Sequence, residues 1–497
     1  MTTVHVVTPE QLLRTGRQFT RALDELGLPH GGGVTMLGAN TPEFLAAYRG
    51  TVWSGRYFTP MSWRWTAEEV AYVAQNCDAT ALVVDARWPE LAAAAAPHVA
   101  PEARFAVGGE LPGFRPWADV EALDPEPLHE PTAGAVMMYT SGTTGRPKGV
   151  RRPLPGGPPP SQYGRSGAAM LTAFLPEGTD AAHATHLVTC PLYHAGPLSY
   201  CDGAAVLGAD LVLMERFDPE QFLALVEQHR VSSTFLVPIQ FVRLLRLPKE
   251  VRDRYDLSSL RLVVHGSAPV AVEVKQQMID WLGPVLYEFY GGTEGGGLGI
   301  DSHTWLERPG SVGRPYPGRN LEVVILDEEG RPQPPGVEGM VYFRDTSQEP
   351  FAYKDDPDAT AQAWRDGRFT LGDIGYLDED GYLYLCDRRS DVIISGGVNI
   401  YPAQIEAVLL EHPAVADCCV VGVPDDEWGE RVHAVVHLTD GGATDADELL
   451  AHCRARLAGY QVPRSVELAD ALPRTETGKL ARRTIRERYW AGRSRRI

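Results

Sequence analysis

Short apolar runs alternate with amphipathic helical stretches over most of this chain, and this alternation limits the folds that it can adopt. Thr66 and Glu69 form a capping box that begins one helical stretch, and the apolar run 81–84 follows it as a strand. The same order of strand and helix returns between residues 189 and 290. Strands that alternate with helices form parallel sheets covered by helices, so the sequence predicts an α/β fold.

The length of the chain predicts more than one domain. With 497 residues it is too long for a single compact core. From Leu321 to Phe343 the pattern changes to strands and turns, which predicts a β-subdomain. A second change comes near Ser390, where a compact α+β unit begins. We therefore expect a large N-terminal domain over residues 1–389 and a small, mobile C-terminal domain over residues 390–497.

Composition excludes several classes of protein. A net charge of −19 argues against the basic face that nucleic-acid binding requires, so we expect no nucleic-acid partner. Seven cysteines without a C-x-x-C pair indicate neither a disulfide framework nor a zinc site. No signal-peptide pattern is visible, and no apolar run approaches the ~20 residues of a membrane span. We expect a cytoplasmic protein without an integral membrane segment.

The strongest chemical signal is a stretch of hydroxyls and glycines with one lysine, from Tyr139 to Gly149. It follows the apolar run 135–138, which is typical of a buried strand. Glycines let backbone N–H groups point inward, hydroxyls add donors, and Lys148 adds a positive charge, so the stretch has the chemistry of a polyphosphate cradle. It is not a Walker A loop, because Gly149 follows Lys148 and the glycine spacing differs.

This ordered string resembles the phosphate-binding signature of the adenylate-forming superfamily, which comprises acyl-CoA synthetases, luciferases and the adenylation domains of peptide synthetases. Four further motifs follow in the order found in that family, so the resemblance covers essentially the whole chain. It implies a site for ATP and for the AMP part of an intermediate. The residues implied to bind the nucleotide are Thr140, Ser141, Gly142, Thr143, Thr144, Gly145, Lys148, Gly266, Ser267, Glu288, Tyr290, Gly291, Thr293, Asp373 and Arg388.

Two of the four further motifs, the second of them in two parts, lie between residues 191 and 294, at the ends of predicted strands, where ligands collect in parallel sheets. By resemblance, His194 shapes the pocket for the carboxylate substrate, and we assign it no work as a general base. Thr293 would hold the α-phosphate and Glu294 would bind Mg²⁺, because a hard cation prefers carboxylate oxygen and substrate phosphates. The residues that would surround adenine are Gly266, Ser267, Glu288 and Tyr290.

The next motif, made of residues 370–375 and 387–391, completes the nucleotide site in this resemblance. Asp373 would accept the ribose hydroxyls, and Arg388 would bridge hydroxyl and phosphate. The family often has threonine immediately before the first glycine of this motif, and Leu371 departs from that pattern.

The resemblance also implies a moving small domain. Ser390 corresponds to the hinge, a position that is commonly Asp or Lys in the family. The lysine equivalent to Lys479 contacts the substrate carboxylate and the α-phosphate during adenylation. Rotation about Ser390 would then withdraw Lys479 and present Gly396 and Gly397 to a channel for pantetheine.

Five glycines follow the predicted strand 285–290, and Gly291 and Gly292 among them are assigned, with His194, to the acyl pocket. Positions without side chains can leave open space for a bulky apolar acid, since such sites are mostly apolar. Alternatively, these glycines only allow the loop its backbone angles while side chains from elsewhere fill the space. The sequence leaves both interpretations open.

Together these residues predict an ATP-dependent acid:CoA ligase that uses ATP, Mg²⁺ and CoA. A carboxylate attacks the α-phosphorus of ATP, pyrophosphate leaves, and the acyl-adenylate passes its acyl group to the CoA thiol. Two alternatives stay open: an adenylating enzyme that loads a pantetheinylated carrier protein, and an ATP-binding protein without catalysis. The identity of the acid and assembly into a homodimer also stay open. The implied catalytic residues are Lys479, Thr293, Glu294 and His194.

Overall fold

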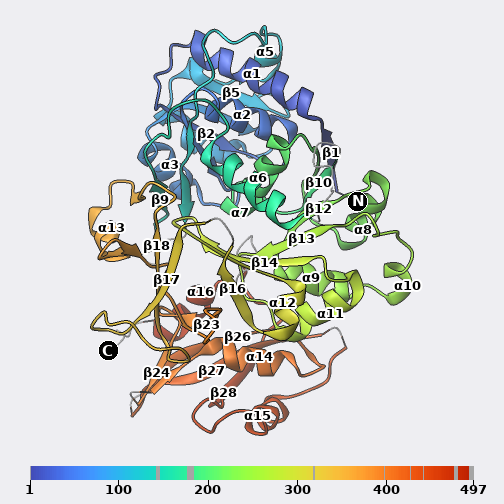
Figure 1. Ribbon diagram of the computed structural model, residues 1–497, viewed down its shortest axis with the longest axis vertical. Helices are drawn as coiled ribbons and strands as arrows, with labels where there is room; N and C mark the ends of the chain where they lie inside the picture. The colour runs from blue at the N-terminus through green and yellow to red at the C-terminus, as the bar shows by residue number, and fades with distance from the viewer. Residues whose placement is uncertain are drawn as a thin grey trace.

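Figure 1 shows the computed structural model of the chain, with a large N-terminal part above a smaller C-terminal part. The predicted α/β fold with these two parts is confirmed. Among the residues that the structure describes, no helix is long and apolar enough to cross a membrane. The described residues are 2–140, 146–175, 184–316, 319–396, 398–425, 427–439, 441–474 and 480–491.

The first sheet has six strands, all parallel. In spatial order they are β6 (Arg115–Pro116), β5 (Arg104–Val107), β4 (Ala79–Asp85), β2 (Gly33–Leu37), β3 (Tyr57–Met61) and β7 (Ala135–Val136). Its helices are α1 (Pro9–Glu25), α2 (Pro42–Val52), α3 (Ala67–Asn76), α4 (Pro89–Ala95), α5 (Ala118–Glu121) and the 3₁₀ turns Ala96–His98 and Pro101–Ala103. The predicted capping box is present at α3, where Thr66 Oγ1 accepts from Glu69 N at 3.2 Å and Glu69 Oε2 accepts from Thr66 N at 2.8 Å.

The second sheet begins with five parallel strands and one antiparallel edge strand, β1. In spatial order they are β1 (Val4–Val7), β11 (Asp210–Met214), β10 (Thr185–Val188), β12 (Ser233–Leu236), β13 (Leu262–Gly266) and β14 (Leu286–Gly292). The helices of this region are α6 (Gln162–Phe174), α7 (Ala195–Val206), α8 (Pro219–His229), α9 (Pro238–Leu245), α10 (Lys249–Arg252), α11 (Val272–Leu282) and α12 (Ser302–Glu307).

The second sheet continues into the predicted β-subdomain through antiparallel pairs. These strands are β15 (Gly295–Asp301), β16 (Ser311–Pro315), β23 (Leu383–Arg388), β22 (Asp373–Leu377), β18 (Gly339–Asp345), β21 (Arg368–Phe369) and β20 (Trp364–Arg365), with β17 (Leu321–Leu326) beside β18 and one helix, α13 (Pro357–Ala363). A separate sheet of three strands contains β19 (Ala352–Tyr353), β9 (Lys148–Arg151) and β8 (Met138–Thr140).

Helices α6 and α7 of the second sheet contact α2 of the first sheet, and these contacts join the two sheets. On α2, Tyr48 Oη donates to Asp202 of α7 at 2.5 Å, and Arg49 Nη2 lies 3.0 Å from the other oxygen of that carboxylate. Where α6 crosses α7, a Cβ on Gly167 would lie 1.9 Å from Ser199 O, so only glycine permits this approach. The interface is buried and polar at its centre, which fixes the two sheets relative to each other.

The C-terminal part is an α+β unit with its own apolar core, as predicted. Its strands are β25 (Val398–Ile400), β24 (Ile393–Ser395), β27 (Gly429–Leu438), β26 (Val415–Asp425) and β28 (Ser465–Leu468), and its helices are α14 (Pro402–Leu410), α15 (Ala446–Arg454) and α16 (Arg482–Trp490). It contacts the large part through a hydrogen bond of 3.0 Å from Arg246 Nη2 to Ala416 O. The exact domain boundary near Ser390 stays a prediction.

Candidate active site

Several predicted nucleotide residues gather where strands of the second sheet end. Gly266 ends β13 and pairs with Phe289 of β14, next to Tyr290. Ser267 follows with a φ of +69°, a left-handed backbone that strains a residue other than glycine. In parallel sheets, ligands bind at the carboxyl ends of the strands. This edge is therefore the candidate active site.

Asp373 connects the β-subdomain to this edge. One oxygen of its carboxylate accepts from Tyr290 Oη at 2.5 Å, and the other lies 3.2 Å from Arg388 Nε. Burial first, and then the charge of Asp373, raise the pKa of Tyr290. The Arg388 side chain is 55% exposed, whereas that of Asp373 is 9% exposed. Each carboxylate oxygen keeps a second lone pair, so Asp373 retains acceptors for the predicted ribose contact.

The predicted phosphate loop joins two strands that pair with each other. Thr140 ends β8 and lies opposite Lys148, the first residue of β9. Both ends of the connecting segment are thus held by one antiparallel pair. The residues of this segment that lie outside the described part of the chain are Ser141, Gly142, Thr143, Thr144 and Gly145. Their contacts with phosphate stay a prediction.

Tyr353 links the predicted phosphate and magnesium residues, although no sequence motif pointed to it. Its Oη donates to Glu294 Oε1 at 2.8 Å, and Lys148 Nζ lies 5.2 Å from its ring centroid. Lys148 also lies 3.7 Å from Asp356 Oδ2. Burial, followed by the charge of Glu294, raises the pKa of Tyr353, so the phenol stays a neutral donor. Tyr353 reaches this place because β19 pairs with β9, which the local sequence does not reveal.

Glu294 suits a magnesium ion that arrives with a nucleotide. It is partly exposed at the turn between β14 and β15, and its neighbour Thr293 lies in the same turn. No group of three or more His, Cys, Asp or Glu within the described ranges could hold a metal ion. Mg²⁺ at this position would therefore depend on Glu294 together with substrate phosphates, which is a usual way of binding this ion.

The carboxylate of Glu288, predicted to border adenine, is buried in an ion pair instead. Its Oε2 accepts from Lys275 Nζ at 2.6 Å, and the two side chains are 8% and 0% exposed. Lys275 Nζ also lies 4.6 Å from the ring centroid of Trp305. Burial raises the pKa of Glu288 and lowers that of Lys275. Only the backbone of Glu288 is therefore left to border an adenine ring.

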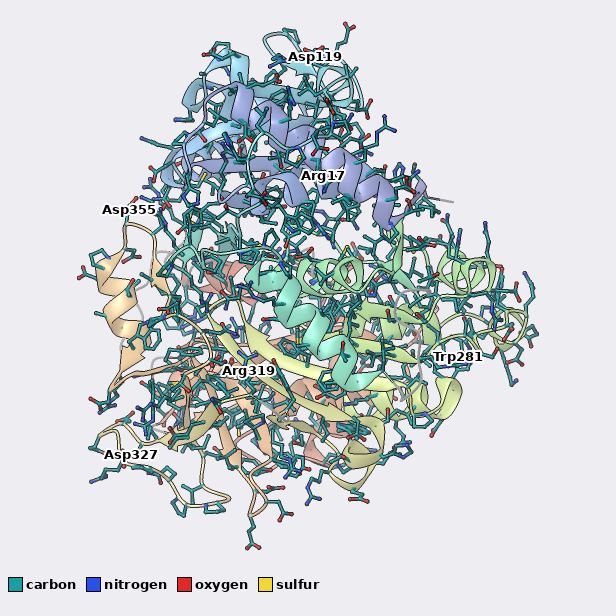
Figure 2. The ribbon with its side chains drawn as sticks, turned by 45° about the horizontal axis from the view of Figure 1, so that its top comes forward. Arg17, Asp119, Trp281, Arg319, Asp327 and Asp355 are labelled. Atoms are coloured by element: carbon teal, nitrogen blue, oxygen red, sulfur yellow. The ribbon has the colours of Figure 1, made fainter. Side chains whose placement is uncertain are left out.

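The glycine cluster after β14 is packed by distant side chains. A Cβ on Gly292 would lie 2.7 Å from Leu371 Cδ2, and one on Gly295 would lie 2.7 Å from Phe369 Cζ. A Cβ on Gly297 would lie 2.6 Å from Nη1 of Arg319, which Figure 2 labels near the middle of the molecule. Gly295, Gly296 and Gly297 have φ values of +139°, +88° and +126°. These contacts favour the second interpretation, in which other side chains fill the space.

His194 lies beside an aromatic side chain at the start of α7. Its ring centroid is 4.7 Å from that of Tyr193. A Cβ on Gly196 would lie 3.1 Å from Phe235 Cζ, and the rings of Phe235 and Tyr200 are 5.4 Å apart. The role of His194 toward the acid stays a prediction.

The predicted hinge and channel residues lie around the start of the C-terminal part. Ser390 is exposed between β23 and β24, and its Oγ donates to Asp391 Oδ1 at 3.2 Å. Gly396 has a φ of +59°, and a Cβ there would lie 2.4 Å from Cε3 of Trp428. The turn itself thus requires a glycine at Gly396. Outside the described residues lie Gly397 and Lys479.

A cavity of about 400 Å³ opens elsewhere, between α1, α2 and the segment 127–132. Arg17, labelled on α1 in Figure 2, contributes to its wall. None of the predicted site residues lines it. The cavity is therefore separate from the candidate active site.

Comparison with protein families agrees with this geometry. A family model described as AMP-binding enzyme matches residues 4–348, more than half of the chain. The chain belongs to the AMP-binding enzyme family. A second model, described as AMP-binding enzyme C-terminal domain, matches residues 404–479. The resemblance to the adenylate-forming superfamily is confirmed.

Relatives of this AMP-binding enzyme cover nearly its whole length. A feruloyl-CoA synthase of Amycolatopsis sp is 35% identical over 97% of this chain and 94% of that protein. The fatty acid–[acyl-carrier-protein] ligase ScoC of Streptomyces coeruleorubidus is 32% identical over 99% of this chain and 93% of its own. The solved structure of the amide bond synthetase McbA from Marinactinospora thermotolerans matches with a TM-score of 0.81 at 31% identity, covering 97% and 95% of the two chains.

Proposed function

We propose that this AMP-binding enzyme is an ATP-dependent acid:CoA ligase. It converts a carboxylate and ATP to acyl-AMP and pyrophosphate, and then transfers the acyl group to the thiol of CoA. The activity predicted from the sequence agrees with the family and with the names of the relatives.

Two polar arrays on either side of the end of β14 support this proposal most directly. Lys148, Tyr353 and Glu294 form the first array, which has the charges suited to phosphates and their cation. The second is the carboxylate of Asp373 between Tyr290 Oη and Arg388, which suits a ribose. Because Tyr290 and Glu294 lie on one strand and its turn, a single nucleotide can contact both arrays.

These residues would act in two steps. In the first, Lys148 and Lys479 meet the charge that develops on the phosphoryl oxygens as the acid oxygen bonds to the α-phosphorus and pyrophosphate leaves. Glu294 would hold Mg²⁺, which would supply further charge neutralisation. In the second, the CoA sulfur bonds to the acyl carbon and AMP leaves, after the small domain has rotated about Ser390 and presented Gly396 and Gly397.

The acid is proposed to be apolar and larger than acetate. The aromatic ring of Tyr193 beside His194 supports this, since apolar contact area adds ~25 cal/mol per Å² of binding energy. The names of the relatives, which include a feruloyl and a fatty acid ligase, point the same way. The glycine cluster does not contribute to this argument.

CoA is the proposed acceptor, and a pantetheinylated carrier protein is the alternative that the name of ScoC raises. The cytoplasm is the proposed location, because all seven cysteines are free thiols, as is usual in a reducing compartment. Homodimer formation stays a prediction that light scattering checks.

ATP–pyrophosphate exchange over acetate, hexanoate, palmitate, benzoate and ferulate tests the first step. CoA, a carrier protein or an amine is then added to see which acceptor consumes the adenylate. We expect exchange with a larger acid and thioester formation with CoA. Exchange without CoA consumption would favour another acceptor. Absence of exchange with every acid would favour a non-catalytic ATP-binding protein.

A further inference from the structure

Arg152, which follows β9 directly, donates hydrogen bonds to the turn that contains Thr293 and Glu294. Its Nη1 donates to Thr293 O at 3.4 Å, and its Nη2 donates to Glu294 O. Its Nε donates to Glu349 O at 3.2 Å. One guanidinium thus holds two consecutive carbonyls of the turn and fastens them to the segment that precedes β19.

The turn needs such a support because its own sequence supplies little. Glycines flank it on both sides, at Gly291–Gly292 and Gly295–Gly297, so its flanks carry no side chains that could anchor it. Arg152 holds the backbone of Glu294, whereas Tyr353 holds its carboxylate. Both supports come from the three-stranded sheet, since β9 leads into Arg152 and β19 contains Tyr353.

The same sheet positions Lys148, four residues before Arg152. The lysine of the phosphate array and the brace of the magnesium turn are therefore parts of one continuous segment. Burial lowers the pKa of Arg152, and the Phe351 ring centroid lies 5.8 Å from its guanidinium carbon. In such surroundings hydrogen bonds to carbonyls are stronger than in water.

We propose that Arg152 is a positioning residue for adenylation. It holds the Thr293–Glu294 turn at a fixed position relative to Lys148, so that Mg²⁺ and the α-phosphate can contact the turn and the lysine at the same time. This inference rests on the proposed function. A planar fork with several N–H groups spans two carbonyls, whereas the single ammonium of lysine does not reproduce that geometry.

Arg152→Gln and Arg152→Lys test the proposal by pyrophosphate exchange at increasing Mg²⁺ concentration. We expect Arg152→Gln to lower the exchange rate by roughly tenfold to a hundredfold and to raise the Mg²⁺ concentration for half-maximal rate. Arg152→Lys should recover only part of the loss. The KM for the acid and the conversion of supplied acyl-adenylate to thioester should change little.

Arg151→Gln is the matched control, because the Arg151 guanidinium lies over the ring of Tyr57, 4.6 Å from its centroid. It should leave the Mg²⁺ dependence unchanged. A role in folding alone would instead lower the melting temperature of Arg152→Gln and slow both half-reactions equally. That result, or an unchanged Mg²⁺ dependence in Arg152→Gln, overturns the proposal.

Calorimetric titration with ATP, with and without Mg²⁺, gives a second readout that does not need turnover. The gain in ATP affinity on adding Mg²⁺ should be smaller in Arg152→Gln than in the unaltered protein. If the unaltered protein shows no exchange with any acid, the proposed ligase function is wrong, and this titration still decides the role of Arg152. Equal gains in both proteins contradict it.

Discussion

The carboxylate of Asp387 accepts a hydrogen bond from the backbone amide of Ala403 at 3.0 Å, and the predicted hinge residue Ser390 lies between them in the chain. Asp387 belongs to β23 of the large part, and Ala403 lies in the first turn of α14 in the small part. An acidic side chain at a helix N-terminus is favourable. Because the bond spans the hinge, it stabilises the orientation that keeps α14 beside β23.

Asp387→Asn should change how stability depends on pH. Burial raises the pKa of Asp387 to about 6, against the lowering effect of Arg482 and of two backbone hydrogen bonds. An unfolded Asp has a pKa of about 3.9, so the folded protein binds this proton more tightly. The stability that this bound proton contributes is fully present below about pH 4 and is lost as the pH rises through about 6.

Asparagine keeps an acceptor oxygen but does not titrate. As the pH rises from about 4 to above 6, the free energy of unfolding of Asp387→Asn should therefore increase relative to that of the unaltered protein, by up to about 3 kcal/mol. Thermal unfolding of both proteins over this pH range is the measurement. Curves that stay parallel would show that Asp387 does not titrate there.

Tyr353→Phe should weaken adenylation through Glu294 while leaving Lys148 supported. The variant keeps the ring beneath Lys148 and loses the hydrogen bond of 2.8 Å to Glu294 Oε1. A hydrogen bond to a charged group contributes about 1.5–3 kcal/mol, so we expect a rate roughly tenfold to a hundredfold lower, and a higher Mg²⁺ concentration for the half-maximal rate.

The matched control for Tyr353→Phe is Tyr255→Phe, which also removes a tyrosine–glutamate hydrogen bond, the one of 3.0 Å to Glu220. It should affect neither the rate nor the Mg²⁺ requirement. Similar effects of both substitutions on pyrophosphate exchange would argue that the Tyr353 hydroxyl matters only for stability.

Lys479→Ala should abolish adenylation and spare thioester formation from supplied acyl-adenylate. Loss of one charge-assisted contact of ~2–3 kcal/mol lowers a rate by roughly two orders of magnitude. The two half-reactions are measured separately, by pyrophosphate exchange and by consumption of CoA. Equal loss of both would indicate misfolding or a role shared by the two steps.

Gly292→Ala should lower activity with every acid alike, and Leu371→Ala should restore it. The added Cβ would lie 2.7 Å from Leu371 Cδ2, a clash that costs on the order of 1 kcal/mol. Trimming Leu371 removes the clash, so a double-mutant cycle should show a favourable coupling. Kinetics with hexanoate and palmitate separate the alternatives, because a pocket wall at Gly292 would instead penalise the longer acid selectively.

Local sequence order predicted the fold and the strand ends well. The Thr66–Glu69 capping box, the alternating strands and the C-terminal α+β unit all follow from neighbouring residues, and each is present. Asp373 and Arg388, 15 positions apart, come together because β22 pairs with β23.

The residues that the sequence did not reveal act across long separations. Tyr353 and Arg152 reach Glu294 only through the pairing of β9 with β19, and Lys275 reaches Glu288 from a helix. Each is a common residue type in an ordinary local pattern, so nothing in its neighbourhood marks it. The glycine-rich segment 291–297 is the opposite case. Its composition is obvious in the sequence, but its role depends on which side chains pack against it, and those come from distant parts of the chain.

That packing has a practical consequence for building chimeras between relatives. A segment 291–297 transplanted alone would arrive without Arg319, Phe369 and Leu371, whose side chains occupy the volume above its glycines. A host with smaller residues there would gain a void, and one with larger residues would push the graft out of place. The unit to move between enzymes is therefore the loop with these three partners, assembled from separate stretches of the chain.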